Sequence, residues 1–146
     1  MPTYTVTVLE GTLDSEKKAR IAQEVTRVHS EVTGAPSFFA QVIFSEVKAG
    51  NYYIAGKPLG HPQIYLHGQI RAGRSIEIKD VLIKQMVDAI ATAADVARTG
   101  VWVYLVDLVP RQMVEFGHVL PESGDEPHWT ANLPDQDRAW MKALEA

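Results

Sequence analysis

The order strand, helix, strand occurs twice in this sequence, and this repeat limits the possible folds more than any other feature. Residue periodicity predicts the first copy as a strand over 3–9, a helix over 14–33 and a strand over 38–46. The second copy follows about 61 residues later, as a strand over 63–70, a helix over 75–95 and a strand over 101–108. Two consecutive βαβ units predict an α/β (α+β) fold, with a four-stranded sheet and two helices on one of its faces.

The predicted strands have one apolar face and one face of mixed character. The apolar positions are Tyr4, Val6, Val8, Ile64, Leu66, Ile70, Val101, Val103 and Leu105. The alternate positions carry threonines, His67 and the aromatic residues Tyr65, Trp102 and Tyr104. Such a face can be solvated, but a patch with three large aromatic rings is unusual on a monomer. We therefore expect this face to join subunits.

Residues 109–146 do not continue the repeat. Prolines and glycines recur through 109–133 and predict an arm of turns, lying over a neighbouring subunit or over its own surface. A short helix is expected over 134–146, with Trp140, Met141 and Leu144 as its docking face. The predicted organisation is one domain over 1–146, with a pseudo-repeat of 2–60 and 62–108 and an arm over 109–146.

Composition excludes several function classes. Fourteen basic and eighteen acidic residues give a net charge of −4, which argues against nucleic-acid binding. The absence of cysteine excludes disulfides and thiolate chemistry, and the five histidines have no metal-ligand spacing, so no metal is expected. The longest apolar run, 101–106, is too short for a membrane span, and the N-terminus has no signal-peptide pattern. We expect a cytoplasmic protein that does not bind membranes.

Two arginines stand where a predicted strand ends and a helix begins. Arg71 and Arg74, in Arg-Ala-Gly-Arg-Ser, would add fixed positive charge to the unpaired N–H groups of the helix N-terminus. They could equally be solvent-facing. Because the chain has no glycine-rich phosphate loop, a small carboxylate is the anion that fits better than a nucleotide.

Four other residues could carry chemistry. His29 lies at a helical position beside an apolar stripe and is by itself a typical boundary residue. Tyr104 lies mid-strand and needs a hydroxyl partner if buried. Glu115 is flanked by apolar residues, a setting that can raise a carboxyl pKa or hold a water molecule. If Met1 is removed, Pro2 becomes a secondary amine with a pKa of roughly 8, suited to acid–base work.

Several short motifs together resemble the tautomerase superfamily, which includes 4-oxalocrotonate tautomerase and macrophage migration inhibitory factor. Within it, the chain is most similar to the cis-3-chloroacrylic acid dehalogenase family. The similarity runs nearly end to end. Its motifs are Pro2, Ala40-Gln41-Val42, His67-Gly68, Arg71-Ala72-Gly73-Arg74-Ser75, Val101-Trp102-Val103-Tyr104, Gln112-Met113-Val114-Glu115 and Asn132-Leu133.

The resemblance implies roles for individual residues. Pro2 matches the N-terminal proline that delivers a proton to the substrate's α-carbon. Arg71 and Arg74 match the pair that binds the substrate carboxylate, and His29 helps to position it. Tyr104 and Glu115 match the pair that orients and activates the attacking water, and a glutamate is the base of that pair.

The resemblance also implies a homotrimer without a cofactor, acting on a small carboxylate. The expected activity is hydration and hydrolytic dehalogenation of cis-3-haloacrylates, giving malonate semialdehyde. Two alternatives stay open: a keto–enol tautomerase acting on 2-hydroxy-dienoates or phenylenolpyruvate, and a non-enzymatic trimeric binding protein. The chain departs from the dehalogenase pattern at Ala35, where a hydroxyl residue is expected, and at Phe116 and His118, where tyrosine and arginine are common.

Overall fold

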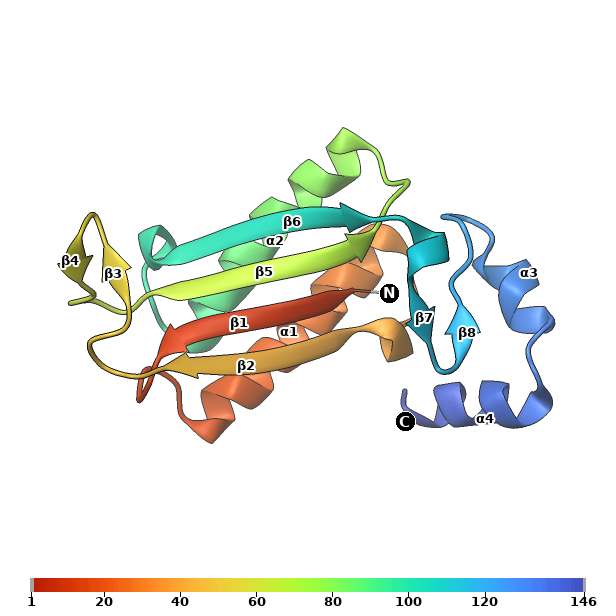
Figure 1. The fold of residues 1–146 in the computed structure, drawn as a ribbon, viewed down its shortest axis with the longest axis horizontal. Coiled ribbons are helices and arrows are strands. Elements are labelled where there is room, and N and C mark those ends of the chain that lie inside the picture. Colours follow the sequence, from red (N-terminus) through yellow and green to blue (C-terminus); the bar gives the residue numbers. More distant parts are fainter. Residues whose placement is uncertain (1, 146) are drawn as a thin grey trace.

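The computed structural model describes residues 2–145 and confirms the predicted pair of βαβ units. The main elements are β1 (Thr3–Leu9), α1 (Ser15–Thr33), β2 (Gln41–Val47), β5 (Ile64–Arg71), α2 (Ile76–Ala94) and β6 (Val101–Leu108). The strand order is β2-β1-β5-β6, in which β1 and β5 are antiparallel and each is parallel to its outer neighbour. Both helices cover the same face of this sheet (Figure 1).

The long helices begin and end at residues that the sequence marks. The Asp14 side chain accepts a hydrogen bond from the Lys17 N–H at 2.7 Å and caps α1, and Gly34 ends it in the left-handed region at φ 71°. The Ser75 hydroxyl caps α2 through the Ile78 N–H. Within residues 2–145, the helices fall short of the length and apolar character needed to cross a membrane.

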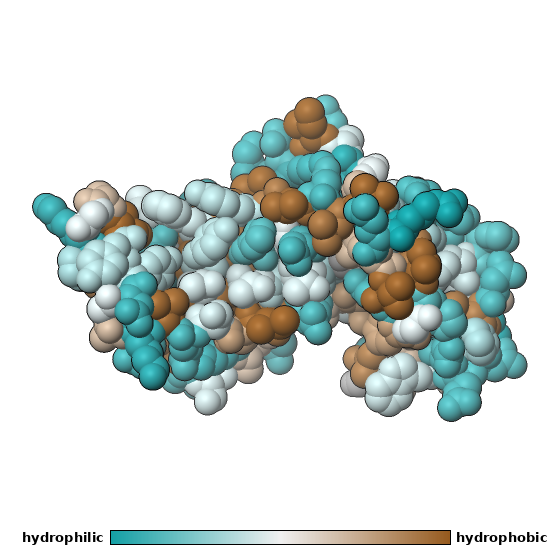
Figure 2. Space-filling view, in the orientation of Figure 1, coloured by the Kyte–Doolittle hydropathy of each residue, from teal (hydrophilic) through white to brown (hydrophobic). Residues whose placement is uncertain are grey.

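The two faces of the sheet differ as predicted. The apolar positions of β1 and β5 are fully buried against the helices, and those of β6 are buried or half-buried. The opposite face is uncovered and mixes hydrophilic with hydrophobic side chains (Figure 2). Trp102 and Tyr104 on β6 are 43% and 54% exposed. Two large aromatic side chains therefore lie open on a face of mixed polarity.

The prediction of a strand over 38–46 is wrong at its start. Ser37–Phe39 forms a short 3₁₀ helix, and β2 begins only at Gln41. The rings of Phe38 and Phe39 pack against Phe116, and Phe39 also against Trp129. These long-range contacts override the strand propensity of the two phenylalanines.

The prediction of turns over 109–133 is incomplete, because this segment contains the 3₁₀ turn Pro110–Gln112, the hairpin of β7 (Val114–Glu115) with β8 (His118–Val119), and α3 (Glu126–Ala131). The predicted helix over 134–146 is confirmed as α4 (Asp135–Ala143). The arm shares a second small core with the segment between α1 and β2, through Leu120, Phe39 and Ala35. A further hairpin, β3 (Tyr53–Ile54) with β4 (Lys57–Pro58), lies at the other end of the sheet (Figure 1).

The predicted docking face of the last helix is largely wrong. Met141 is buried, but Trp140 is 60% and Leu144 is 51% exposed. The arm stands beyond the end of the sheet, so α4 has no extended surface of its own chain to pack against (Figure 1).

Candidate active site

The starts of β1 and β2 and the ends of β5 and β6 lie together at one end of the sheet. Because β1 and β5 are antiparallel, the start of β1 lies beside the end of β5. Pro2 directly precedes β1 and is buried, and its carbonyl accepts a hydrogen bond from the Gln41 N–H at 3.0 Å. The arm extends from this same end of the sheet (Figure 1). Met1, and with it the predicted removal of that residue, lies outside the described residues.

Arg71 and Arg74 are both withdrawn from solvent. Arg71, the last residue of β5, is fully buried, and Arg74 is 9% exposed. The Nη1 atom of Arg74 donates to the Arg71 carbonyl at 2.9 Å, which fixes the second guanidinium against the first residue. The alternative of two solvent-facing arginines is therefore wrong. The close approach of two buried cations is the arrangement expected where an anion binds.

Residues of the arm bind the Arg71 guanidinium at the end of β5. Its Nη1 atom donates to the carbonyls of Pro121 at 2.8 Å and Glu122 at 3.3 Å, and its Nη2 atom is ion-paired with Glu126. Glycine is required nearby: Gly73 has φ 108°, and a Cβ atom there would lie 2.9 Å from that of Ser123. The sequence reasoning missed Glu126, because no local spacing connects position 126 with position 71.

His29 is a buried residue of α1 that contacts β1. Its Nδ1 atom lies 2.7 Å from the Tyr4 hydroxyl, and both side chains are withdrawn from water. The Tyr4 ring reaches this place by lying over Gly68, where a Cβ atom would be 2.6 Å from the ring. The reading of His29 as a boundary residue is therefore replaced by that of a buried, oriented one.

Burial and positive charge set the protonation states of this pair. Burial, together with the charge of Arg74, lowers the pKa of His29 to about 3, so the imidazole is neutral at physiological pH. Burial raises the pKa of Tyr4 above its ordinary value, and the charge of Arg74 only partly offsets this. A neutral phenol that donates to Nδ1 leaves the proton of the imidazole on Nε2.

Acid should destabilise the fold through His29. Its native pKa of about 3 lies below the ordinary 6.5, so the unfolded state binds more protons between these values, and stability falls as pH drops through that window. At pH 5 the loss should be about 2 kcal/mol relative to neutral pH. Urea unfolding of wild type and His29→Gln at pH 7.5 and pH 5 measures it. Equal losses in both proteins would show that His29 does not carry the effect.

Four buried side-chain nitrogen atoms have no hydrogen-bond partner among the described residues. One of them, Gln63 Nε2, lies just before β5, at the end of that strand opposite Arg71. The other three are His29 Nε2, Arg71 Nε and Arg74 Nε. An unpaired buried N–H is costly, and such groups are retained where a ligand completes them. These donors suit a carboxylate. Within residues 2–145, no group of three or more histidine, aspartate or glutamate side chains could hold a metal ion.

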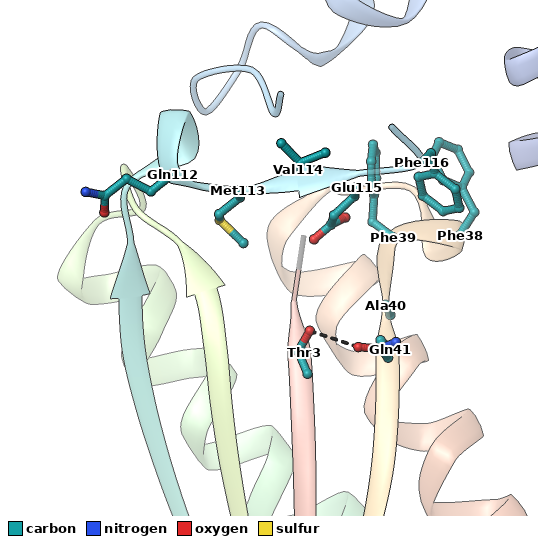
Figure 3. Close-up of a pocket in the computed structure, with 10 residues that line it drawn as sticks. All are labelled: Thr3, Phe38, Phe39, Ala40, Gln41, Gln112, Met113, Val114, Glu115 and Phe116. Carbon is teal, nitrogen blue, oxygen red and sulfur yellow. Dashed lines mark hydrogen bonds between the residues drawn. The ribbon is translucent and has the colours of Figure 1, made fainter. Parts of the chain in front are cut away.

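Glu115 lies at a cavity of about 640 Å³ beside the start of β1. Thr3, Gln41 and the phenylalanines 38, 39 and 116 line the same cavity. The half-buried Glu115 carboxylate points from β7 toward the start of β1 (Figure 3). A carboxylate in this position can act as a base toward a molecule bound next to Pro2.

Tyr104 is the one predicted site residue that does not lie at this end of the sheet within a single chain. It lies in the middle of β6, in register with His67, and is exposed on the uncovered face of the sheet. Its ring contacts that of Tyr65 edge-on, with centroids 5.1 Å apart. Tyr104 could therefore meet such a site only from a neighbouring chain.

Comparison with known proteins accounts for this arrangement. The model of the Tautomerase_3 family, whose description is "Putative oxalocrotonate tautomerase enzyme", matches residues 1–132. The chain belongs to the tautomerase superfamily. A crystal structure of N1, a member of the cis-3-chloroacrylic acid dehalogenase family, superposes with a TM-score of 0.94 at 31% identity, covering 97% of this chain and 99% of N1. The similarity predicted from sequence motifs is confirmed.

Two further relatives are similar to this tautomerase-superfamily chain. The first is a much shorter protein, and the second is a solved structure with a lower TM-score than N1. The 2-hydroxymuconate tautomerase of Bacillus subtilis is 39% identical over 59 residues, which are 40% of this chain and 94% of that protein. Nearly a whole relative thus corresponds to less than half of this chain. A structure described as a fused 4-OT wild type asymmetric trimer has a TM-score of 0.73 at 25% identity, covering 80% of this chain and 94% of that one.

Proposed function

We propose that this chain is a cofactor-independent hydratase that dehalogenates small unsaturated carboxylic acids of the cis-3-haloacrylate type. The observation that carries the proposal is the half-buried carboxylate of Glu115 at the cavity beside the start of β1. Moving a proton between carbon and oxygen needs only the amine of Pro2. A second acid–base group is needed when water must attack.

The proposed reaction uses the buried donors first. Arg71, Arg74 and His29 bind the substrate carboxylate and draw electron density away from the β-carbon. Glu115 then takes a proton from water as the water oxygen bonds to the β-carbon. Protonated Pro2 donates a proton to the α-carbon. The adduct carries chlorine and hydroxyl on one carbon, and it loses HCl to give malonate semialdehyde.

Tyr104 enters this proposal through assembly. In a homotrimer formed through the uncovered sheet face and the 109–133 arm, the exposed Tyr104 would lie at a subunit boundary. From there it could hold the attacking water in the site of an adjacent copy, together with that copy's own carboxylate base.

The domain organisation that we propose for each subunit is one domain over 1–146, with pseudo-repeats 2–60 and 62–108.

The trimer should be visible in solution. Light scattering or sedimentation at micromolar concentration should give about three times the 16.2 kDa chain mass. Burial of the patch formed by the exposed aromatic residues Trp102 and Tyr104 supplies the driving force, since exposed aromatic surface favours association. Trp102→Glu, which places a charge in that patch, should shift the protein toward monomer. A wild-type monomer at this concentration would contradict the assembly.

A keto–enol tautomerase is the alternative that a specific observation favours. The 2-hydroxymuconate tautomerase of Bacillus subtilis matches 59 residues of this chain. In that reaction neutral Pro2 would act as a base on a 2-hydroxy-dienoate or on phenylenolpyruvate, with the arginines holding the carboxylate. A non-enzymatic trimeric binding protein is the third reading, and the buried donor set beside an acid–base pair counts against it.

The test of the proposal requires a free Pro2. An intact mass one methionine below the full chain identifies protein in which Pro2 carries an ionisable amine. Such protein should release chloride from cis-3-chloroacrylate. The same protein with Met1 retained should not, because an amide nitrogen cannot deliver the proton. Equal chloride release by both forms would contradict the role of Pro2.

A further inference from the structure

One segment of the arm encloses most of the Arg71 guanidinium. Within residues 121–126, two carbonyls accept from Nη1 and the Glu126 carboxylate is paired with Nη2. The second oxygen of that carboxylate, Oε2, accepts the Gly124 N–H at 2.8 Å. Glu126 is therefore fixed at both of its oxygens, and it fixes Arg71 in turn.

These contacts leave one edge of Arg71 for a ligand. A guanidinium has five N–H donors in a rigid plane, so holding its Nη atoms also sets the direction of Nε–H. The Nε atom is buried without a hydrogen-bond partner among the described residues, and so is that of Arg74. Both arginines thus keep an unused Nε, while the protein binds both Nη atoms of Arg71 and the Nη1 atom of Arg74.

The charge of Glu126 also belongs to this arrangement. Its side chain is 19% exposed, whereas that of Arg71 is fully buried. Burial raises the pKa of Glu126, but hydrogen bonds from the backbone and from Arg71, with the charge of Arg71, leave the pKa below its usual value. An ionised Glu126 offsets the repulsion between the two buried guanidinium groups.

We propose that Glu126 is a positioning residue, which holds the Arg71 guanidinium so that its Nε–H faces the substrate carboxylate. This inference rests on the proposed carboxylate-binding function. It assigns the arm a part in the site: the segment 121–126 sets the direction of a binding group without touching the substrate itself.

Two other roles for Glu126 lead to different results. If Glu126 blocked Arg71 from substrate, its removal would tighten binding of a carboxylate. If the ion pair only held the arm to the sheet, its removal would lower stability and leave binding by the folded protein unchanged. The sign and the size of the change in affinity therefore separate all three roles.

The probe is propionate, a saturated three-carbon carboxylate that cannot be hydrated. Its Kd is measured for wild type, Glu126→Ala and Glu126→Gln, each first shown to be folded. Glu126→Ala should weaken binding at least 10-fold, because Arg71 loses its fixed direction. Glu126→Gln should weaken it less, since the amide oxygen still accepts from Nη2. Asp135→Asn is the matched control, because it removes one negative charge from an exposed residue of the arm outside segment 121–126, and it should bind like wild type.

The Nε–H signal of Arg71 in ¹H–¹⁵N spectra gives a second readout. In wild type, propionate should shift this signal, and in Glu126→Ala the signal should move to the position of solvent-exposed arginines. Unchanged or tighter propionate binding by folded Glu126→Ala would overturn the proposal, as would a wild type that does not bind propionate. If wild type binds propionate in a Glu126-dependent way but does not release chloride, the hydratase function fails and the positioning role stands.

Discussion

Replacing Arg74 with alanine should lower kcat/KM for small carboxylates by about 10²–10³-fold while the protein stays folded. Arg74 is 9% exposed and its Nε atom has no partner among the described residues, so its removal takes away a desolvated donor. Loss of a single preorganised donor to developing charge has an effect of about this size. Steady-state kinetics on cis-3-chloroacrylate and on phenylenolpyruvate measure it, because both reactions need the carboxylate bound.

Two comparisons define this result. Arg71→Ala should lose a similar factor and should also destabilise the fold by about 3 kcal/mol, because it leaves Glu126 without its partner. Arg111→Ala removes an exposed arginine of the arm and should leave both reactions unchanged. Wild-type efficiency in folded Arg74→Ala would show that the carboxylate binds elsewhere.

Glu115→Gln should separate hydration from tautomerisation. The amide keeps the shape of the side chain but cannot take a proton from water, so hydration of cis-3-chloroacrylate should fall by about 10²-fold or more. Ketonisation of phenylenolpyruvate should fall far less, since Pro2 moves that proton. Chloride release and loss of enol absorbance, measured on the same preparation, give the two rates.

The control for this variant is Glu16→Gln, which makes the same change on an exposed residue of α1. Both of its rates should match those of wild type. If Glu115→Gln hydrates as fast as wild type, the carboxylate at the cavity is structural and the water is activated by another group.

The sequence predicted those parts of the molecule that depend on local periodicity. Asp14, Gly34 and Ser75 mark the helix ends through contacts within one turn, and alternation along β1 and β5 separates the two faces of the sheet. Phe38 and Phe39 break this rule, because their partners Phe116 and Trp129 lie far away in the chain.

The candidate site shows the same division. The turn from Arg71 to Arg74 follows from a strand end next to a helix start, whereas the partners of the Arg71 guanidinium come from the arm. Glu126 could not be predicted, since its pairing with Arg71 spans 55 residues and arises only when the arm folds back. The contact between His29 and Tyr4 could not be predicted for a related reason, because the alternation along β1 indicates only that Tyr4 is a core residue.

The central claim is that this site adds water to an unsaturated acid. The most direct measurement follows wild type with a free Pro2, verified by intact mass, on cis-3-chloroacrylate and on phenylenolpyruvate. The proposed mechanism predicts chloride and malonate semialdehyde in equal amounts from the first substrate. Rapid ketonisation of the enol, with neither chloride nor malonate semialdehyde formed, would contradict it and identify a tautomerase instead.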